Sequence, residues 1–255
     1  MRFYKYHAAG NDFIITDDLS VTPADAPRLC NRSTGIGADG ILLHRPSTRG
    51  DARMVIVNAD GSMATMCGNG LRCFCRYLAE QHGIGKEHFH IETDAGMRSC
   101  FVRNNGAEWR ITVDLGMAEV CDDPSPGRWQ VNIGNPHLVV IDSSSEREAR
   151  ETALRLQHEY RGARNVEVVW SVDPLGRTIR LVVNERGVGF TAACGTGGGA
   201  VTAAFHRAGI VRADEEWTLW FPGGALYYRI DREGHIFMTG DAVFVFRGTT
   251  DVRAE

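Results

Sequence analysis

Two segments of the chain repeat one pattern, and this repeat constrains the fold more than any other feature of the sequence. Residues 58–83 read NADGSMATMCGNGLRCFCRYLAEQHG, and residues 184–209 read NERGVGFTAACGTGGGAVTAAFHRAG. Both segments begin with Asn, reach a C-G-x-G motif, continue with the composition of a helix and end at a Gly. The chain is therefore predicted to contain two copies of one unit.

Each predicted helix is followed by two predicted strands joined by a glycine-containing turn. The turn glycine, Gly96 in the first copy and Gly223 in the second, follows its cysteine at the same spacing. The strands are His88–Glu92, Arg98–Arg103, Trp217–Phe221 and Ala225–Ile230. The second helix is rich in Ala and Gly, which favours close packing of strands around it. We predict an α+β fold of two pseudo-symmetric halves, each a mostly antiparallel β-sheet rolled around a central α-helix.

A polar stretch rich in proline and glycine separates the two copies. It reads DDPSPGR at Asp122–Arg128, a composition typical of a linker. We therefore place an N-terminal half carrying Cys67 at residues 1–121 and a C-terminal half carrying Cys194 at residues 122–255.

Charge and hydropathy argue against several classes of function. The formal net charge is −4 with both signs interspersed, which gives no electrostatic footprint for nucleic acid or an anionic membrane. The apolar runs have strand length, far short of the roughly 18 residues of a membrane helix, and the first residues show no signal-peptide core. We expect a soluble, cytoplasmic protein that binds a small molecule and neither nucleic acid nor a membrane.

The chain has seven cysteines, an odd count that argues against a disulfide framework. Cys73 and Cys75 form C-x-C inside a predicted helix without a second pair, so no metal site is expected. Isolated cysteines are usually small buried hydrophobic residues. This is our interpretation of the five cysteines outside the repeated motif, which are Cys30, Cys73, Cys75, Cys100 and Cys121.

The two repeated cysteines are different, because each stands at a helix start. The positive end of the helix dipole lowers the pKa of a thiol there and favours the thiolate. The free N–H groups of the first turn form an anion site. Two such sites facing each other could hold one carboxylate while Cys67 and Cys194 approach its α-carbon from opposite sides. Inverting an α-carbon needs this pair, because one sulfur removes a proton while the other returns one.

Motifs along nearly the whole chain resemble those of the diaminopimelate epimerases, within the wider group of two-cysteine, pyridoxal-independent amino-acid racemases. C-G-N-G together with N-A-D-G-S is specific to this family. The matching runs are HAAGNDF at His7–Phe13, GIGADG at 35–40, NADGSMATMCGNGLR at 58–72, GNPH at 134–137, ERG at 185–187, ACGTG at 193–197 and PGG at 222–224.

The resemblance implies two similar halves with the active site between them, and interconversion of LL- and meso-2,6-diaminopimelate without a cofactor or metal. It also suggests a homodimer. Cys67 and Cys194 match the acid–base pair of the family. The other matching site residues are Gly68, Asn69, Gly195 and Thr196 as the cradle of the reacting carboxylate, Asn11 near the reacting centre, His137 and Glu185 near the sulfurs, and Asn58, Asn135, Asn165 and Arg186 at the distal end of the substrate.

Several of these residues have an alternative, purely structural interpretation. Asn58 and Asn135 could cap turns, because Asn side chains commonly bond their own backbone there. His137 could be a structural histidine, and Glu185 and Arg186 could form a surface pair.

One position departs from the family pattern and keeps the substrate open. Phe190 stands where the family usually has Glu, four residues before the second cysteine. A phenyl ring there could change the wall of the pocket, so a racemase of the same mechanism acting on another amino acid, such as histidine, is the alternative. A binding protein that lost the chemistry is a third possibility, against which both cysteines and their glycines argue.

Overall fold

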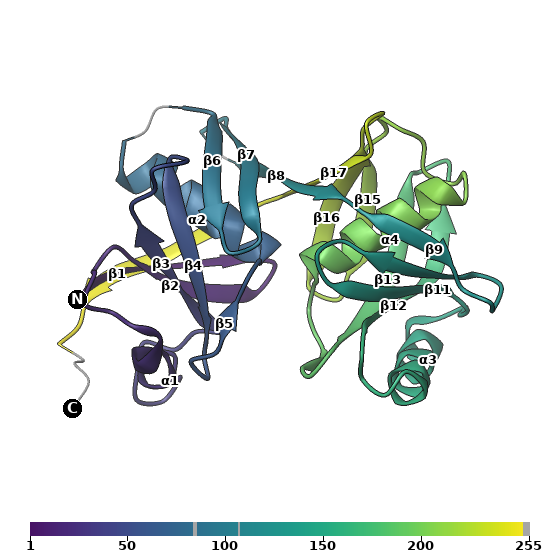
Figure 1. Ribbon diagram of the computed structural model, residues 1–255, viewed down its shortest axis with the longest axis horizontal. Helices are drawn as coiled ribbons and strands as arrows, with labels where there is room; N and C mark the ends of the chain where they lie inside the picture. The colour runs from purple at the N-terminus through teal and green to yellow at the C-terminus, as the bar shows by residue number, and fades with distance from the viewer. Residues whose placement is uncertain (84–85, 107, 252–255) are drawn as a thin grey trace. The chain divides into compact units, whose positions relative to one another are not determined.

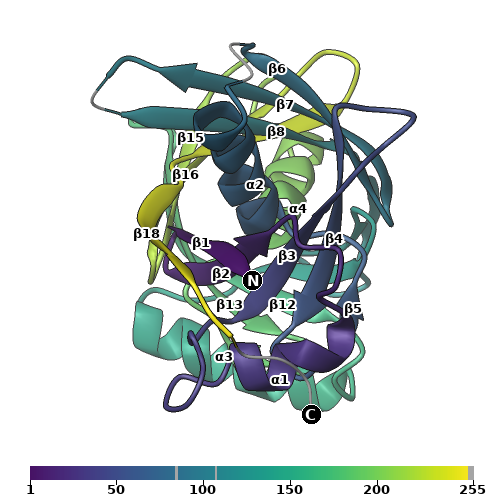
Figure 2. The same ribbon diagram turned by 90° about the vertical axis from the view of Figure 1, so that its left-hand side faces the viewer.

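The computed structural model describes residues 1–83, 86–106 and 108–251, which form two compact units. Unit 1 comprises Met1–Val113 and the described residues from Gly240 onward, and unit 2 comprises Asp114–Thr239. In each unit, strands surround one long helix (Figures 1 and 2). The predicted α+β fold, with sheets rolled around central helices, is therefore confirmed.

In unit 1 the central helix is α2, which packs against β1, β2, β4 and β7. Figure 2 shows these strands on several sides of the helix. Strand neighbours pair antiparallel, except β2 with β3 and β4 with β6, which run parallel. The elements are β1 (Arg2–Ala8), β2 (Asn11–Thr16), a 3-10 turn (Pro23–Asp25), α1 (Ala26–Leu29), β3 (Gly40–Arg45), β4 (Ala52–Asn58), β5 (Met63–Ala64), α2 (Gly68–Gln81), β6 (His88–Thr93), β7 (Gly96–Asn104), β8 (Trp109–Met117, of which the residues from Asp114 onward belong to unit 2) and β18 (Val243–Thr249).

In unit 2 the central helix is α4, which packs against β9, β10, β11, β12 and β16. The parallel pairs are β11 with β12 and β13 with β15, and the other neighbours are antiparallel. The elements are β9 (Glu119–Asp122), β10 (Arg128–Asn132), β11 (Pro136–Ile141), α3 (Glu146–Glu159), β12 (Asn165–Asp173), β13 (Thr178–Glu185), β14 (Gly189–Phe190), α4 (Gly195–Arg207), β15 (Trp217–Phe221), β16 (Gly224–Ile230) and β17 (His235–Gly240).

The order of pairings is the same in both units, but the last strand of each repeat joins the other unit. β9 follows the first repeat and pairs with β10, whereas β18 ends the second repeat and pairs with β1. The compact units therefore differ from the sequence halves 1–121 and 122–255, because hydrogen bonding between strands, rather than chain order, decides membership. The stretch predicted as a linker, Asp122–Arg128, connects β9 and β10 inside unit 2.

Both central helices begin and end where the sequence predicts. Cys67 and Cys194 are the N-caps, with extended backbone conformations. Gly83 and Gly209 follow the last turns with φ of +60° and +75°. Glycine adopts this left-handed conformation without strain, so it stops each helix.

The turn glycine of the second copy is Gly224 rather than Gly223. Gly96 pairs with the last residue of the preceding strand and has a φ of +99°, and Gly224 does the same with a φ of +122°. Gly223 is needed for its small size, because a Cβ there would lie 2.8 Å from the carbonyl oxygen of Ala192. Unit 2 therefore has one additional residue between cysteine and turn.

The small residues of α4 permit the close packing that the sequence predicts. A Cβ on Gly198 would lie 2.3 Å from the ring of Tyr228, and one on Gly199 would lie 2.9 Å from the side chains of Leu115 and Ile133. At Gly198 the neighbouring strand therefore approaches α4 more closely than alanine would allow, whereas at Gly199 only the ends of two aliphatic side chains would have to move.

All seven cysteines are free thiols in the structure. Of the five interpreted as packing residues, Cys30, Cys73, Cys75 and Cys100 are buried, whereas Cys121 on β9 is exposed. Among the described residues, no helix combines the length and the apolar character needed to cross a membrane.

Candidate active site

Cys67 lies in unit 1 with its sulfur at the start of α2. The sulfur accepts a hydrogen bond from the N–H of Gly70 at 3.3 Å. A donor in the first turn, together with the helix dipole, stabilises negative charge on the sulfur. Gly68 and Asn69 precede the first helical hydrogen bond, from Leu71 to the Cys67 carbonyl, so their N–H groups have the helix-terminal position expected of an anion site.

Asn11 provides an oxygen to the same sulfur. Its Oδ1 lies 3.9 Å from the Cys67 sulfur and accepts from Nδ2 of Asn69 at 3.4 Å. Its Nδ2 donates to Asp39 at 2.8 Å. Because a carboxylate only accepts, Asp39 binds the NH₂ end of Asn11 and leaves its oxygen toward the cysteine. The buried Arg72 holds Asn69 by donating to its Oδ1 at 3.0 Å.

A group of ion pairs fixes this loop. Lys5 is buried, and its ammonium lies 2.6 Å from Asp12. Arg32 donates to Asp12 at 2.7 and 3.1 Å and to Asp39 at 2.8 Å. Burial alone would raise the pKa of Asp12, but the hydrogen bonds from Arg32 and Lys5 outweigh it and hold that pKa well below its usual range.

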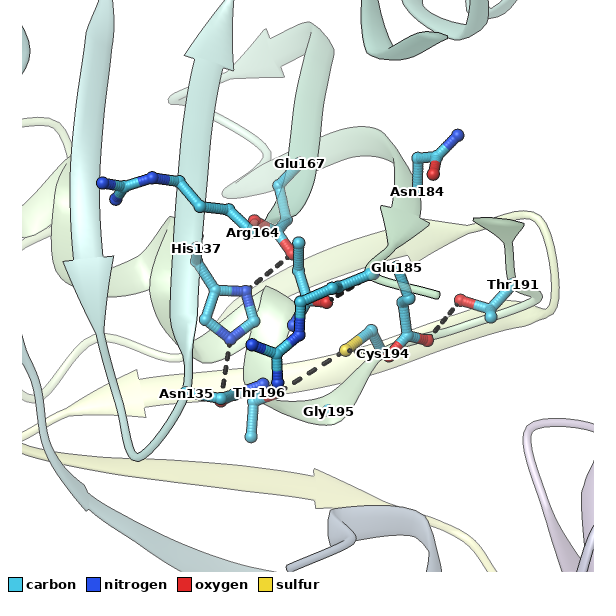
Figure 3. A network of polar contacts seen from close by, with 12 residues as sticks. Asn135, His137, Arg164, Glu167, Asn184, Glu185, Thr191, Cys194, Gly195 and Thr196 are labelled. Atoms are coloured by element: carbon cyan, nitrogen blue, oxygen red, sulfur yellow. Dashed lines mark hydrogen bonds and ion pairs between the residues drawn. The ribbon is translucent and has the colours of Figure 1, made fainter. Parts of the chain in front are cut away.

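Cys194 lies in unit 2 among a different set of polar groups (Figure 3). Its thiol donates to Oε2 of Glu185 at 3.3 Å, and Thr191 donates to the other oxygen of that carboxylate at 2.6 Å. The hydroxyl of Thr196 lies 3.5 Å from the sulfur. Tyr228 donates to the Gly195 carbonyl at 3.0 Å and holds the first turn of α4.

The surroundings of Cys194 favour the neutral thiol. Burial raises the pKa of Cys194 well above the usual thiol range, and the negative charges of Glu185 and Glu167 raise it further. The Thr196 hydroxyl acts in the opposite direction. At rest, Cys194 is therefore suited to giving a proton.

Each sulfur thus has at least one hydrogen-bond acceptor and one donor beside it among the described residues. For Cys67 these include Asn11 Oδ1 and the Gly70 N–H, and for Cys194 they include Glu185, the Thr196 hydroxyl and the Gly197 N–H. An acceptor holds the thiol and a donor holds the thiolate, so each cysteine can exist in both forms. A residue that acts as acid in one direction and as base in the other must be stabilised in both of these forms.

A chain of polar side chains leads from the half-buried Thr196 and Asn135 to the buried His137 and Glu167 (Figure 3). Asn135 Nδ2 lies 3.5 Å from the Thr196 hydroxyl, and Asn135 Oδ1 lies 3.0 Å from His137 Nε2. His137 Nδ1 lies 2.8 Å from Glu167 Oε1, and neither side chain of that pair is exposed. His137 and Asn135 therefore connect to Cys194 through Thr196.

Glu167 and Asp39 are among the site residues that the sequence analysis did not predict. Glu167 is the single carboxylate in the buried run NVEVV of β12. Because a buried charge needs a partner, this pattern was the sequence feature that could have identified Glu167. Asp39 lies within the GIGADG motif, whose sequence does not reveal that it holds Asn11.

Three predicted residues lie outside the hydrogen-bonded groups that surround the two sulfurs. Asn58 is exposed at the end of β4 and donates to Ser62 at 2.9 Å, as in the turn-capping alternative. Asn165 accepts from the backbone N–H of Arg186 at 2.9 Å and so positions that loop. Within the described part of the chain, the exposed Arg186 guanidinium has no ion-pair partner. No group of three or more His, Cys, Asp or Glu side chains among residues 1–83, 86–106 and 108–251 is placed to hold a metal ion.

Comparison with known proteins gives full-length relatives. Residues 3–121 and 129–245 match the model of a family described as diaminopimelate epimerase. A diaminopimelate epimerase from Synechococcus elongatus is 34% identical, with 100% of this chain and 99% of that protein covered. One from Desulfitobacterium hafniense is 33% identical, with 97% of both covered. A chloroplastic one from Oryza sativa subsp. japonica is 36% identical, with 98% and 80% covered.

Solved structures with low sequence identity share the fold. A phenazine biosynthesis protein from Bacillus anthracis superposes with a TM-score of 0.75 at 17% identity, covering 98% of this chain and 99% of that one. A hydroxyproline epimerase from Agrobacterium vitis gives a TM-score of 0.70 at 15% identity, with 97% and 90% covered. The fold predicted from the repeat is therefore one that solved structures contain.

Proposed function

The chain belongs to the diaminopimelate epimerase family, and on this premise we propose that it interconverts LL- and meso-2,6-diaminopimelate with Cys67 and Cys194 as the acid–base pair. Relatives of this name match nearly the whole chain. The observation that supports the mechanism is that each helix-start sulfur has both a hydrogen-bond donor and an acceptor. The reaction supplies a lysine precursor and a peptidoglycan cross-linking residue.

The reaction moves one proton off the α-carbon and another onto it. One sulfur, as thiolate, takes the proton from the α-carbon, and the C–H electron pair passes into the carboxylate as a carbanion equivalent. The other sulfur, as thiol, gives its proton to the opposite face, and the two sulfurs exchange protonation states. Burial and Glu185 favour Cys194 as the resting thiol, which leaves Cys67 as the resting base.

The negative charge that develops on the substrate carboxylate needs fixed donors. The N–H groups of Gly68 and Asn69 at α2, and of Gly195 and Thr196 at α4, supply them in this proposal. Arg186 suits the distal carboxylate, because its guanidinium is exposed and can bind a carboxylate with two parallel hydrogen bonds. Asn58, Asn135 and Asn165 complete the distal site.

The proposal includes a cofactor-independent reaction, a cytoplasmic location and a homodimer. No cofactor is required, because paired sulfurs and fixed N–H donors supply the proton transfers and the charge stabilisation. The dimer is tested by light scattering on the eluting protein, in which a monomer mass would contradict it.

The experiment is to incubate the reduced protein with LL-diaminopimelate in deuterated water and to follow the product by NMR and chiral chromatography. We expect the meso isomer, with deuterium at the inverted α-carbon. Cys67→Ala and Cys194→Ala should each abolish conversion, and Cys121→Ala, at an exposed cysteine, should retain it.

Two other outcomes separate the alternatives. Deuterium in another amino acid, but none in diaminopimelate, would leave the mechanism in place and change the substrate. A protein that binds diaminopimelate without exchange, and whose cysteines do not react with an aziridine analogue of it, would be a binding protein.

A further inference from the structure

The carboxyl group of Glu167 lies beside the first turn of α4 and has no role in the mechanism proposed above. A Cβ on Gly197, the third residue of that helix, would lie 2.7 Å from Glu167 Oε1. Glycine at this position therefore leaves room for the carboxyl group. Glu167 is fully buried, and its Oε2 has no hydrogen-bond partner among the described residues. Such a group is costly to bury, which argues that it has a use.

The hydrogen bonds from Glu167 to Cys194 have a defined direction. Asn135 turns its NH₂ group toward the Thr196 hydroxyl, so its Oδ1 must accept from Nε2–H of His137. With Nε2 protonated, one further proton lies between His137 Nδ1 and Glu167 Oε1. The Thr196 oxygen accepts from Asn135, and its own proton is then left for the Cys194 sulfur at 3.5 Å.

We infer that Glu167 is a positioning residue that, through His137, Asn135 and Thr196, directs a hydroxyl proton at the Cys194 sulfur and so prepares that sulfur to carry negative charge. The inference rests on the proposed function, in which Cys194 must become a thiolate each time it gives up its proton. Glu167 contacts neither sulfur nor substrate in this role. The hydrogen-bonded part of its effect reaches the sulfur through the Thr196 hydroxyl.

Other groups facing Cys194 have to be separated from this effect. Glu185 on β13 accepts from the thiol, and Tyr228 on β16 donates to the adjacent Gly195 carbonyl. Glu167 also acts directly, because its negative charge raises the pKa of Cys194. The direct effect of the charge and the effect through the hydrogen-bonded chain change the pKa of Cys194 in opposite directions. Removing a negative charge lowers the pKa of Cys194, whereas losing the hydroxyl donor raises it.

The test is the pH dependence of Cys194 alkylation by iodoacetamide in the full-length reduced protein, measured by mass spectrometry of the peptide containing Cys194. We expect Glu167→Met to raise the pH midpoint of Cys194 alkylation by about one pH unit, which corresponds to a tenfold loss of thiolate at a given pH. Glu167→Gln should give a midpoint no higher than that of the wild type, because its NH₂ group can donate to His137 Nδ1 and keep Nε2–H toward Asn135.

A double-variant comparison shows whether the effect passes through Thr196. Thr196→Val alone should raise the midpoint, and adding Glu167→Met should then raise it no further. A fall or no change in Glu167→Met, or the same rise in the Thr196→Val background, would overturn the inference. Glu151→Met, which removes an exposed carboxylate on α3, is the matched control and should change nothing.

If Glu167→Met does not fold, Asn135→Leu breaks the same chain at a partly exposed position, and its midpoint should rise and then be insensitive to Thr196→Val. Alkylation is read whether or not the protein turns over diaminopimelate. Failure of the proposed function would therefore appear in the deuterium experiment alone, and failure of this inference in the alkylation profile alone.

Discussion

The thiol of Cys194 donates to Oε2 of Glu185 at 3.3 Å, and Thr191 holds the opposite oxygen of the same carboxylate at 2.6 Å. The carboxylate is thus fixed from one side while it accepts from the sulfur on the other. A sulfur held in this way keeps its proton, because deprotonation would place two negative charges side by side.

Glu185→Gln should therefore lower the pKa of Cys194. The amide oxygen can still accept from the thiol, but the negative charge that disfavours the thiolate is gone. We expect the midpoint of Cys194 alkylation to fall by roughly one pH unit and epimerisation to slow by about tenfold or more. A midpoint that rises would contradict the assignment of Glu185 as the acceptor of the thiol proton.

Phe190→Glu should leave the substrate unchanged. The Phe190 ring packs against the cluster between α3 and its strands, with the Arg150 guanidinium 4.9 Å from the ring centroid. The next residue, Thr191, faces Glu185, so the two neighbouring side chains have different surroundings. We expect kcat/KM for diaminopimelate to stay within about threefold of the wild type, a change of less than about 0.7 kcal/mol. A gain of activity toward diaminopimelate, with loss toward another amino acid, would restore Phe190 as a determinant of the substrate.

Gly198→Ala should destabilise the protein much more than Gly199→Ala. The new Cβ would meet the buried Tyr228 ring at 2.3 Å in the first variant, and only the ends of the Ile133 and Leu115 side chains at 2.9 Å in the second. Overpacking costs about 1–3 kcal/mol, whereas alanine in a helix is favoured over glycine by about 1 kcal/mol. In urea unfolding, the free energy of unfolding should fall by about 2 kcal/mol for Gly198→Ala and stay nearly unchanged for Gly199→Ala. Equal losses would show that Tyr228 moves as easily as the two aliphatic side chains.

Lys5→Met should destabilise the protein more at neutral pH than in acid. Hydrogen bonds from Arg32 and Lys5 hold the pKa of Asp12 below its usual range, so this stabilisation is fully present above the unfolded pKa of about 3.9 and is lost as the pH falls below it. We expect the free energy of unfolding to fall by about 2 kcal/mol at pH 7. This loss should shrink between about pH 4 and pH 2.

The matched control for Lys5→Met is Arg2→Met. It removes the exposed Arg2–Asp17 pair, whose atoms lie 3.9 Å apart, and should change stability little at either pH. An undiminished loss for Lys5→Met at pH 2 would mean that packing of the lysine stem, rather than the ion pair, stabilises this loop.

The sequence alone determined the features that depend on local pattern. Helix starts at Cys67 and Cys194 and stops at Gly83 and Gly209 follow from capping and from glycine's tolerance of positive φ, so a single segment suffices to predict them. The repeat predicted the fold class, because two copies of one pattern must fold alike.

The tertiary structure decided what depends on partners distant in the chain. β18 joins unit 1 because its hydrogen-bonding partner is β1, and no local pattern carries that information. Glu167 on β12 reaches His137 on β11, and Asp39, just before β3, reaches Asn11 on β2, only because the pairing of these strands brings them together. The direction in which Phe190 points was likewise open in the sequence, since the face of a two-residue strand is set by what packs against it. Local chemistry therefore placed the two sulfurs, and long-range packing selected the groups that control their protons.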